Sequence, residues 1–309
     1  RTFIIFVVNC HLMNVNQSNF DQLWQTIQNH HEHHASILST NTELKNTVIR
    51  GEKSHSLLHL MTADHQSLGR GQHGRSWVSS QGAVFLSLYV PMQSQTQDFG
   101  INQLSGLISL LVGFYLIKMP IITQMNQIRQ TMNLPKIGVK WANDLGVFDE
   151  DSQRFWKLAG VLIEPIFVAK NDHRSLVGLV FGVGMNVQHA PIIQSGTYQA
   201  TSLNMLWYPS LGALPSAQDL YQPICQAICR AIFHHHQLMT SQKTATGFIN
   251  QFNQMHLLTD RQVEIFTQND DTGNRLSGKC LGVDERGALL VQNEQGIQTI
   301  FAGTAKMMT

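Results

Sequence analysis

The chain has 309 residues, enough for one large domain or two unequal ones, and its 43% hydrophobic content excludes a chain without a packed core. Its 21 Lys and Arg nearly balance its 20 Asp and Glu, which argues against an electrostatic surface for nucleic acid. Four cysteines without CxxC spacing require no oxidising compartment, so the expected location is the cytoplasm.

The apolar runs of the sequence are too short to cross a membrane. Residues 104–117 form the strongest run, but Ser and Gly residues interrupt it, and it falls short of the ~20 residues that a span needs. This run therefore predicts a buried helix, and no membrane partner is expected. Two histidine-rich runs, at 30–34 and 234–236, cannot turn all their rings toward one ion from a regular helix and predict no metal centre.

The first half of the chain predicts short helices and strands around a glycine-rich loop. Helical patterns predict two helices, Phe20–His30 and Thr40–Thr47. The second has three candidate caps at its start, Ser39, Thr40 and Asn41. Strand patterns stand on either side of the loop, at Leu57–Met61 and Ala83–Pro91, and a polar connection follows at residues 91–100.

The second half predicts more strands, two helices and a change of texture near its end. Three β-like runs come first, of which the first two are joined by an acidic turn at 149–152: Ile137–Phe148, Lys157–Val168 and Leu176–Val187. Two helical patterns follow, Asp219–Thr240 and Gln242–Met255. From Leu257 the chain reads as four short strands: Gln262–Phe266, Leu276–Gly282, Ala288–Gln292 and Gln298–Phe301. About fifty residues of this kind predict a small β-barrel, and the expected fold class is α+β.

The segment Gly69–Trp77 packs three glycines, two arginines and a tryptophan into nine residues. Glycine lets a backbone approach an anion, arginine grips carboxylate or phosphate oxygens with paired hydrogen bonds, and tryptophan offers a flat face to a base. This composition favours a loop that wraps an anionic ligand carrying a base. An ordinary surface turn with scattered charge is the alternative, because glycine-rich strings are common.

Three later segments carry polar residues at or near strands. Lys140–Leu145 places a cation, an amide and a carboxylate after a strand, where an exposed strand end is the alternative. Lys157–Glu164 puts a lone lysine into an apolar strand, and a buried lysine needs an anionic partner or becomes neutral. Gly182–Val187 lacks the third glycine of a dinucleotide-binding turn and reads as a strand, so a Rossmann site is not expected.

Together these segments resemble the motifs of biotin protein ligases. Four motifs occur in the family's order: the loop ending in Trp77, Lys140–Asp144, Lys157–Gly160 and Gly182–Val187. Upstream, Ser39–Asn41 and Gln66 match the family's early biotin-contacting segments. The resemblance runs from about Ile37 to the C-terminus. It implies an N-terminal extension at 1–36, a catalytic domain with a helix-flanked mixed sheet at 37–256, and an SH3-like β-barrel at 257–309.

The activity that the resemblance implies is that of a biotin–[acetyl-CoA-carboxylase] ligase with biotin, ATP and Mg²⁺. Biotin's carboxylate attacks the α-phosphate of ATP to give biotinyl-5′-AMP and pyrophosphate. A lysine of the biotin carboxyl carrier protein then attacks the activated acyl group and releases AMP. Two anions must be brought together and a pentavalent phosphate stabilised, a task for which cationic side chains are suited.

The resemblance also implies which residues form the site. Arg70 and Lys157 are expected at the junction of carboxylate and phosphate, and Asp144 either binds Mg²⁺ through water or orients the acceptor lysine. The residues expected to contact biotin are Ser39, Thr40, Asn41, Gln66, Gly69, Arg70, Lys157 and Gly160. Those expected to contact ATP or the adenylate are Gly71, Gln72, Arg75, Trp77, Asn143 and Asn186, with Trp77 over the adenine.

Several positions depart from the family pattern. Gln72 and His73 stand where the family commonly has two arginines that help to retain the adenylate, so a looser hold on biotinyl-AMP is expected. Ala142 replaces a usual proline at a position that touches no chemistry. Near the C-terminus, Lys306 rather than an arginine is available to reach back toward the ATP phosphates.

Three other functions are alternatives to this expectation. Some family members carry an N-terminal winged helix that binds DNA, but the residues before Ile37 contain Arg1 as their sole Lys or Arg, so no nucleic-acid partner is expected. A lipoate or octanoyl ligase or transferase of the same fold typically has Arg-Arg-x-Ser-Gly-Gly-Gly in place of the loop motif. A non-catalytic biotin-binding regulator would not need both Arg70 and Lys157. These two functions remain alternatives, and the sequence allows a monomer or a homodimer.

Overall fold

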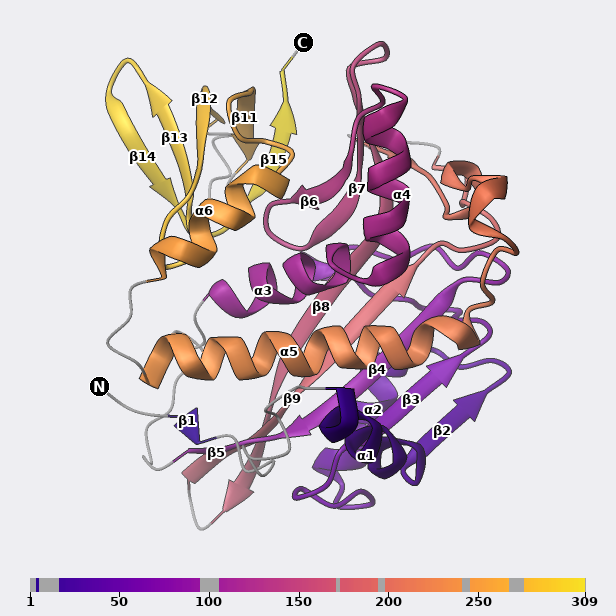
Figure 1. The fold of residues 1–309 in the computed structure, drawn as a ribbon. Coiled ribbons are helices and arrows are strands. Elements are labelled where there is room, and N and C mark those ends of the chain that lie inside the picture. The colour runs from indigo at the N-terminus through magenta and orange to yellow at the C-terminus, as the bar shows by residue number, and fades with distance from the viewer. Residues whose placement is uncertain are drawn as a thin grey trace.

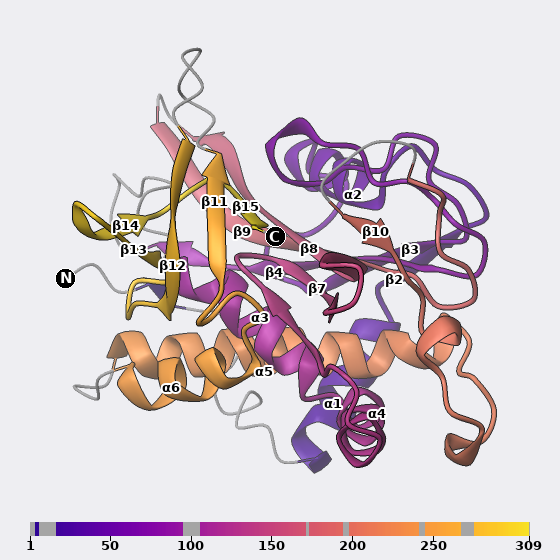
Figure 2. The same ribbon diagram turned by 90° about the horizontal axis from the view of Figure 1, so that it is seen from above.

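Figures 1 and 2 show the computed structural model of the chain, which describes residues 4–5, 17–94, 106–170, 173–193, 198–240, 245–266 and 275–308. A large sheet forms its centre, with the strand order β2–β3–β4–β9–β8–β7–β6 and with β10 beside β8. β2 runs parallel to β3 and β10 parallel to β8, while the other pairs of this sheet are antiparallel. The expected mixed sheet is therefore confirmed.

The strands of the central sheet span His31–His34 (β2), His59–Ala63 (β3), Val84–Pro91 (β4), Ile137–Lys140 (β6), Asp144–Asp149 (β7), Arg154–Lys170 (β8), His173–Met185 (β9) and Gln199–Ala200 (β10). A separate short pair joins β1 (Ile4–Ile5) to β5 (Gln93–Ser94). Short 3₁₀ helices occupy Gln72–Gly74, Asn204–Leu206, Pro209–Leu211 and Gln218–Leu220.

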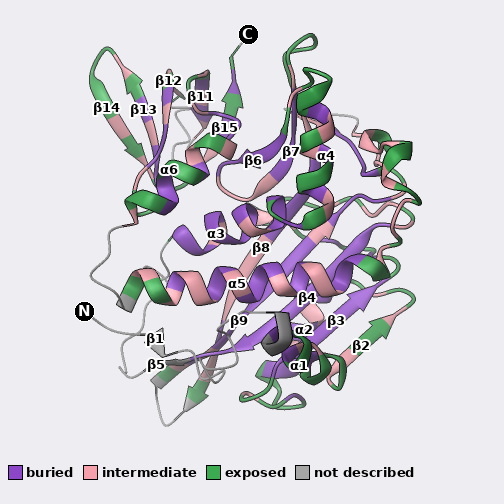
Figure 3. Ribbon diagram, in the orientation of Figure 1, coloured by how far each residue is buried: buried purple, intermediate pink, exposed green. Residues whose placement is uncertain are grey.

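Helices cover both faces of the central sheet. β3 and β4 are buried along their whole length, and β4 is a nearly continuous apolar run, as is typical of strands covered on both sides. α2 (Thr40–Ile49) packs on one face, whereas α1 (Gln17–Gln28), α3 (Leu107–Ile117) and α5 (Tyr221–Thr240) cover the other (Figure 2). The buried residues accordingly follow the strands and the inward sides of α3 and α5 (Figure 3).

Local signals explain where the helices begin. Ser39 caps α2, because its Oγ accepts a hydrogen bond from the Thr42 backbone N–H at 3.4 Å. α3 is apolar all round and most of its residues are buried, so the predicted buried helix is confirmed. α4 (Pro120–Thr131) starts with a proline in its first turn, where no backbone N–H is needed, and α6 (Thr246–Met255) precedes the C-terminal strands.

In the described part of the chain, no single helix is long and apolar enough to span a membrane. α3 and α4 reach that length and apolarity only as a pair, and the pair is bent by 68°.

One sequence prediction is changed by the structure. Ile137–Phe148 is not one strand, because a turn at residues 141–143 separates β6 from β7 and makes Lys140 and Asp144 cross-strand partners. Trp141 lies in this turn and is nevertheless buried, at 5% exposure. Parts of the predicted connection at 91–100 and of the helix Gln242–Met255 lie outside the described residues.

The last strands form a second sheet of five antiparallel strands, in the order β14–β13–β12–β11–β15. Their bounds are Gln262–Phe266 (β11), Arg275–Val283 (β12), Leu289–Asn293 (β13), Gly296–Ile300 (β14) and Thr304–Met307 (β15). A small C-terminal β unit is thus confirmed, while its closure into a barrel stays a prediction. It contacts the rest of the protein through Trp141, whose Nε1–H donates to the Gly287 carbonyl at 3.0 Å.

Candidate active site

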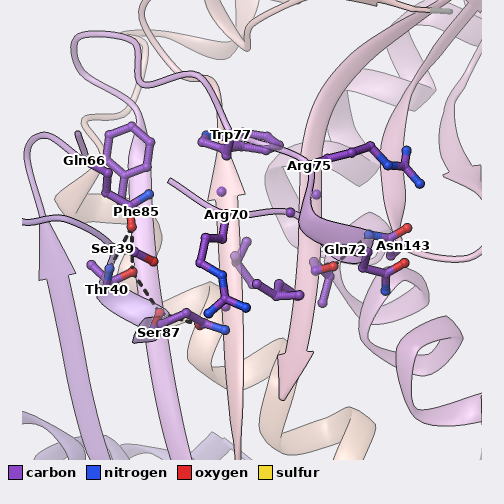
Figure 4. A pocket seen from close by; sticks show the side chains of 18 of the residues that line it. Ser39, Thr40, Gln66, Arg70, Gln72, Arg75, Trp77, Phe85, Ser87 and Asn143 are labelled. Atoms are coloured by element: carbon purple, nitrogen blue, oxygen red, sulfur yellow. Dashed lines mark hydrogen bonds between the residues drawn. The ribbon is translucent and has the colours of Figure 1, made fainter. Parts of the chain in front are cut away.

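One cavity, partly open to solvent, lies over β4, β8 and β9 beside the start of α2. The glycine–arginine loop Gly69–Trp77 closes one side of it (Figure 4). Most of the residues that the sequence singles out line this cavity: Ser39, Thr40, Asn41, Gln66, Arg70, Gly71, Gln72, Arg75, Trp77, Asn143, Asp144, Lys157 and Gly160. Segments distant in the sequence therefore converge on one place.

Uncharged hydrogen-bonding groups gather at one end of the cavity, which we call the polar end: Ser39, Thr40, Asn41, Gln66 and Ser87. The Gln66 Oε1 accepts from the Thr40 backbone N–H at 2.8 Å and from its hydroxyl at 3.1 Å. The Ser87 hydroxyl lies 2.8 Å from Thr40 Oγ1 and 2.7 Å from Asn41 Oδ1 (Figure 4). Buried groups fixed in this way favour a ligand that completes their hydrogen bonds.

Lys157 reaches the cavity because β8 carries a bulge. Leu145 pairs with Ala159 whereas Gly146 pairs with Lys157, so one extra residue of β8 is accommodated between them. This brings the ammonium group within 3.3 Å of the point where a Cβ on Gly160 would stand. Its Nζ lies 2.8 Å from Asp144 Oδ1, which supplies the anionic partner that a lysine in an apolar strand requires.

Two aromatic rings flank the same ammonium group. Lys157 Nζ lies 5.2 Å from the centre of the Trp77 ring and 5.3 Å from that of Tyr198. The indole of Trp77 rests on glycines of β8 and β9 that face each other across the strands. A Cβ on Gly184 would lie 2.7 Å from Trp77 Cε2, and one on Gly160 would lie 3.0 Å from Cζ3. The glycines therefore make room for the indole.

The two loop arginines have different partners. Arg70 forms an ion pair with Glu164, with Nη2 and Oε1 3.1 Å apart, and in Figure 4 it lies between the polar end and the side that holds Arg75. Arg75 donates through Nη2 to the Thr304 hydroxyl in β15 at 3.0 Å. The C-terminal sheet thus meets the loop through Thr304, whereas the expected Lys306 is exposed and pairs in register with Glu264.

Two buried bases lie behind the cavity. Burial lowers the pKa of Lys140 to about 8, although the nearby Asp144 carboxylate acts in the opposite direction. Burial also lowers the pKa of His256 to about 3, and the positive charge of Lys140 adds to this effect. His256 Nε2 accepts from the Trp141 backbone N–H at 3.3 Å, so this imidazole is neutral and structural.

Two expected site residues do not line the cavity. Asn186 is 2% exposed, its amide Nδ2 donates to the Thr201 carbonyl at 2.9 Å, and its Oδ1 accepts from Ser80 at 3.4 Å. It joins the segment after β9 to its neighbours, and its contact with a nucleotide stays a prediction. Gly69 lies against Trp77, where a Cβ would be 2.5 Å from the Trp77 carbonyl oxygen.

No group of three or more His, Cys, Asp or Glu side chains in the described residues is arranged to hold a metal ion. Asp144 offers one carboxylate, already paired with Lys157. A hard cation such as Mg²⁺ is commonly bound by one or two carboxylates together with substrate phosphates. The donor set therefore fits a metal ion that arrives with a nucleotide, and does not fit one held by the protein alone.

Sequence reasoning missed four residues of the site. Ser87 and Tyr198 line the cavity, while Glu164 and Thr304 bind the loop arginines Arg70 and Arg75. Ser87 and Glu164 left a signal, since each is a polar residue inside an otherwise apolar strand. Tyr198 and Thr304 left none, because their contacts depend on segments brought together only by the fold.

Solved structures share this fold. The biotin protein ligase from Aquifex aeolicus in complex with biotin and ATP is 21% identical, with a TM-score of 0.58 over 90% of this chain and 98% of that chain. The helix-flanked mixed sheet followed by a small antiparallel sheet is therefore the biotin protein ligase fold. Residues 34–186 match the family model described as the biotin/lipoate A/B protein ligase family. This match covers just under half of the chain.

Curated relatives agree with this assignment. The bifunctional ligase/repressor BirA of Salmonella typhimurium is 23% identical over 249 residues, which cover 78% of this chain and 64% of the relative. The biotin–[acetyl-CoA-carboxylase] ligase of Mycobacterium tuberculosis is 31% identical over 156 residues, which cover 50% of this chain and 47% of the relative. The chain thus spans less than two thirds of the length of either relative.

Proposed function

We propose that the chain is an ATP-dependent biotin protein ligase. The observation that carries the proposal is the division of one cavity into an uncharged polar end and a cationic end with Arg70 and Lys157. Biotin has the same division, because its ureido ring is polar and uncharged and its valeryl chain ends in a carboxylate. The names of the relatives support this reading, since they are ligases of biotin and one structure holds biotin and ATP.

In this proposal the ureido ring binds the polar end and the carboxylate points to Arg70 and Lys157. A carboxylate oxygen of biotin attacks the α-phosphorus of ATP, a new O–P bond forms, and the bond from that phosphorus to the oxygen bridging to the β-phosphate breaks. Pyrophosphate leaves and biotinyl-5′-AMP remains. Lys157 and Arg70 stabilise the extra negative charge of the pentavalent phosphate. Trp77 covers the adenine, and Gly71, Gln72, Arg75 and Asn143 lie along the nucleotide.

The second step transfers biotin to protein. The ε-amine of a lysine on a biotin carboxyl carrier protein attacks the acyl carbon, an amide bond forms, the acyl–phosphate bond breaks, and AMP and one proton leave. Asp144, whose carboxylate lines the cavity, orients that amine. It is equally the residue for holding Mg²⁺, an ion that neutralises the charge of the phosphates when bound. Residues 37–256 form the catalytic unit and 257–309 the accessory one in this proposal.

Lipoate fits the cavity less well than biotin. Its dithiolane ring is apolar and would add no hydrogen bonds to those that Gln66, Thr40 and Ser87 already make with one another. A site built to hydrogen-bond a polar ring discriminates against an analogue that lacks the matching polar groups. A non-catalytic biotin binder would have no need for two cations around the carboxylate.

The test is a reconstituted reaction with the purified chain. Incubation with biotin, ATP and Mg²⁺ should yield biotinyl-AMP and pyrophosphate, and adding a carrier domain should place biotin on its acceptor lysine, read by mass spectrometry. Replacing biotin by lipoate should abolish both products. Formation of lipoyl-AMP without biotinyl-AMP, or binding of biotin without any adenylate, would contradict the proposal.

A further inference from the structure

Glu164 is a nearly buried carboxylate that collects three donors near the cavity without lining it. It lies on β8, and its side chain is 12% exposed. Asn41 Nδ2 lies 3.0 Å from Oε2, while Lys45 Nζ and Arg70 Nη2 lie 3.2 and 3.1 Å from Oε1. Burial alone would raise the pKa of Glu164, but the Asn41 hydrogen bond and the two positive charges together hold the pKa below its usual value. The carboxylate is therefore ionised at neutral pH.

The hydrogen bonds of Arg70 can be counted. A guanidinium has five N–H groups. Two of them, on Nη1, point to Thr42 Oγ1 at 3.1 Å and to Glu164 Oε2 at 3.4 Å, and one on Nη2 points to Glu164 Oε1 at 3.1 Å. The end of the guanidinium is thereby occupied. The Nε–H and the second Nη2–H have no bond to the described part of the chain.

These two remaining N–H groups lie on one edge of the planar guanidinium, because Nη2 is the amino nitrogen on the same side as the Nε hydrogen. They form a second fork of the kind that grips a carboxylate or phosphate with parallel hydrogen bonds. Glu164 therefore does not compete for this edge. It holds the opposite end of a side chain that is 43% exposed and lines the cavity.

The same carboxylate fixes the amide of Asn41. Because Nδ2 donates to Glu164, the Oδ1 of Asn41 faces Ser87 at 2.7 Å. The opposite orientation of the amide would set Nδ2 toward the Ser87 hydroxyl and lose the bond to the carboxylate. The Oδ1 also stands 2.3 Å from where a Cβ on Gly182 would be, so it packs directly on β9 at the floor of the cavity. One anion thus orients a group at the polar end and the arginine at the cationic end.

We propose that Glu164 is a positioning residue for the adenylation step, which holds the end of Arg70 so that its Nε/Nη2 edge faces the reacting anions. The proposal rests on the ligase function proposed above. Glu164 acts through Arg70 and Asn41 and does not touch a substrate. Its charge stabilises the arginine in one orientation before the substrates arrive, so that less reorganisation is needed during the reaction.

The test compares Glu164→Gln with Lys45→Ala in biotin-dependent ATP–pyrophosphate exchange. Glu164→Gln keeps the shape and removes the charge, so kcat should fall about 10- to 100-fold through misplacement of Arg70. The KM for biotin should rise as well, because the Asn41 amide is no longer held. Lys45 contacts the same carboxylate but does not line the cavity, so Lys45→Ala should stay within about twofold of the wild type.

A purely structural role would lower the temperature of unfolding and leave KM unchanged. Glu164→Asp is a second variant, expected to fold and to lose several-fold in kcat because its shorter side chain withdraws the charge from the guanidinium. Exchange within twofold of the wild type in whichever of the two Glu164 variants folds would overturn the proposal. So would an equal loss in Lys45→Ala. Absence of exchange in the wild-type protein would overturn the ligase function itself, and this proposal with it.

Discussion

At the scale of single residues, Lys157 is a cation that the local structure of its strand directs into the cavity. A bulge in β8 turns it toward the cavity, and the Asp144 carboxylate lies 2.8 Å from its Nζ as the anionic partner. Lys157→Ala should therefore remove about 3 kcal/mol of transition-state stabilisation, a factor of ~10² in kcat for adenylation. The measurement is pyrophosphate exchange at saturating biotin and ATP, with circular dichroism to verify the fold.

Lys279→Ala is the matched control for this variant. Lys279 Nζ also pairs with a carboxylate, Asp260 Oδ1, at 2.9 Å, but this pair is exposed on the C-terminal sheet and away from the cavity. Its removal should leave exchange unchanged. An active Lys157→Ala protein, or an equal loss in both variants, would exclude Lys157 from the chemistry.

The sequence predicts such residues when they break a pattern. Lys157 and Arg70 stand out because one interrupts an apolar strand and the other sits among glycines. The partner of Arg70 could not be predicted, since the contact between the loop and Glu164 depends on the side-by-side placement of β8 and α2. Asn186 was assigned to the nucleotide from its motif alone, whereas its amide is used by Thr201 and Ser80.

At the scale of elements, the paired glycines of β8 and β9 form a floor for the loop tryptophan. Gly184→Ala would place a Cβ 2.7 Å from Trp77 Cε2, so the indole must move, at a cost of about 1–3 kcal/mol. If Trp77 covers adenine, the KM for ATP should rise about tenfold while the KM for biotin changes little. Steady-state exchange with each substrate varied in turn measures both constants.

Gly247→Ala is the control for that substitution. Gly247 lies in α6, and no atom lies within 4 Å of a Cβ added there. Alanine should therefore leave both KM values unchanged and raise stability by about 0.5–1 kcal/mol, because alanine favours a helix more than glycine. An unchanged KM for ATP in Gly184→Ala would show that the position of the indole does not matter for the nucleotide.

Strands and helices were predicted well where a long apolar or alternating run is uninterrupted, as in β4 and α3. The strand prediction is wrong at Trp141–Asn143, where the structure has a turn although Trp141 is buried like a strand residue. The sequence identifies the polar residues but not how a turn pairs the strands on either side of it. The cross-strand pairing of Lys140 with Asp144 is therefore known only from the structure.

At the scale of the whole molecule, the two sheets share one hydrophobic core. Val139 and Leu145 of the central sheet belong to the same buried cluster as Val263 and Leu289 of the C-terminal sheet. The change to short strands and turns near residue 257 is visible in the sequence. The continuity of the core is not, since packing between distant segments leaves no periodic pattern. The domain boundary between residues 256 and 257 therefore stays a proposal.

His256 lies at this junction and couples the stability of the whole molecule to pH. Its Nε2 accepts from the Trp141 N–H, so the neutral ring carries its proton on Nδ1, which donates to Thr259 Oγ1 at 2.9 Å. Protonation of Nε2 would set two N–H groups against each other beside the charged Lys140. Burial, with the positive charge of Lys140, lowers the pKa of His256 in the folded state from 6.5 to about 3.

The sign of the pH dependence follows from that lowered pKa. Below pH 6.5 the unfolded chain binds a proton at His256, whereas the folded chain binds one there only near pH 3. The contribution of His256 to the free energy of unfolding is therefore complete above pH 6.5 and is lost as the pH falls. The loss approaches about 1.4 kcal/mol per pH unit. His256→Gln keeps an acceptor but cannot titrate, so its free energy of unfolding should fall less steeply from pH 6.5 to pH 4.5.

Urea unfolding of wild-type protein and His256→Gln across this pH range measures the difference in slope. Burial also lowers the pKa of His235, to about 4, and this group remains in both proteins, so the slope of the variant should be reduced and not abolished. The exposed His189 provides the control, because His189→Gln should keep the wild-type slope. Equal slopes in wild type and His256→Gln would show that protonation at the junction of the two sheets does not govern acid stability.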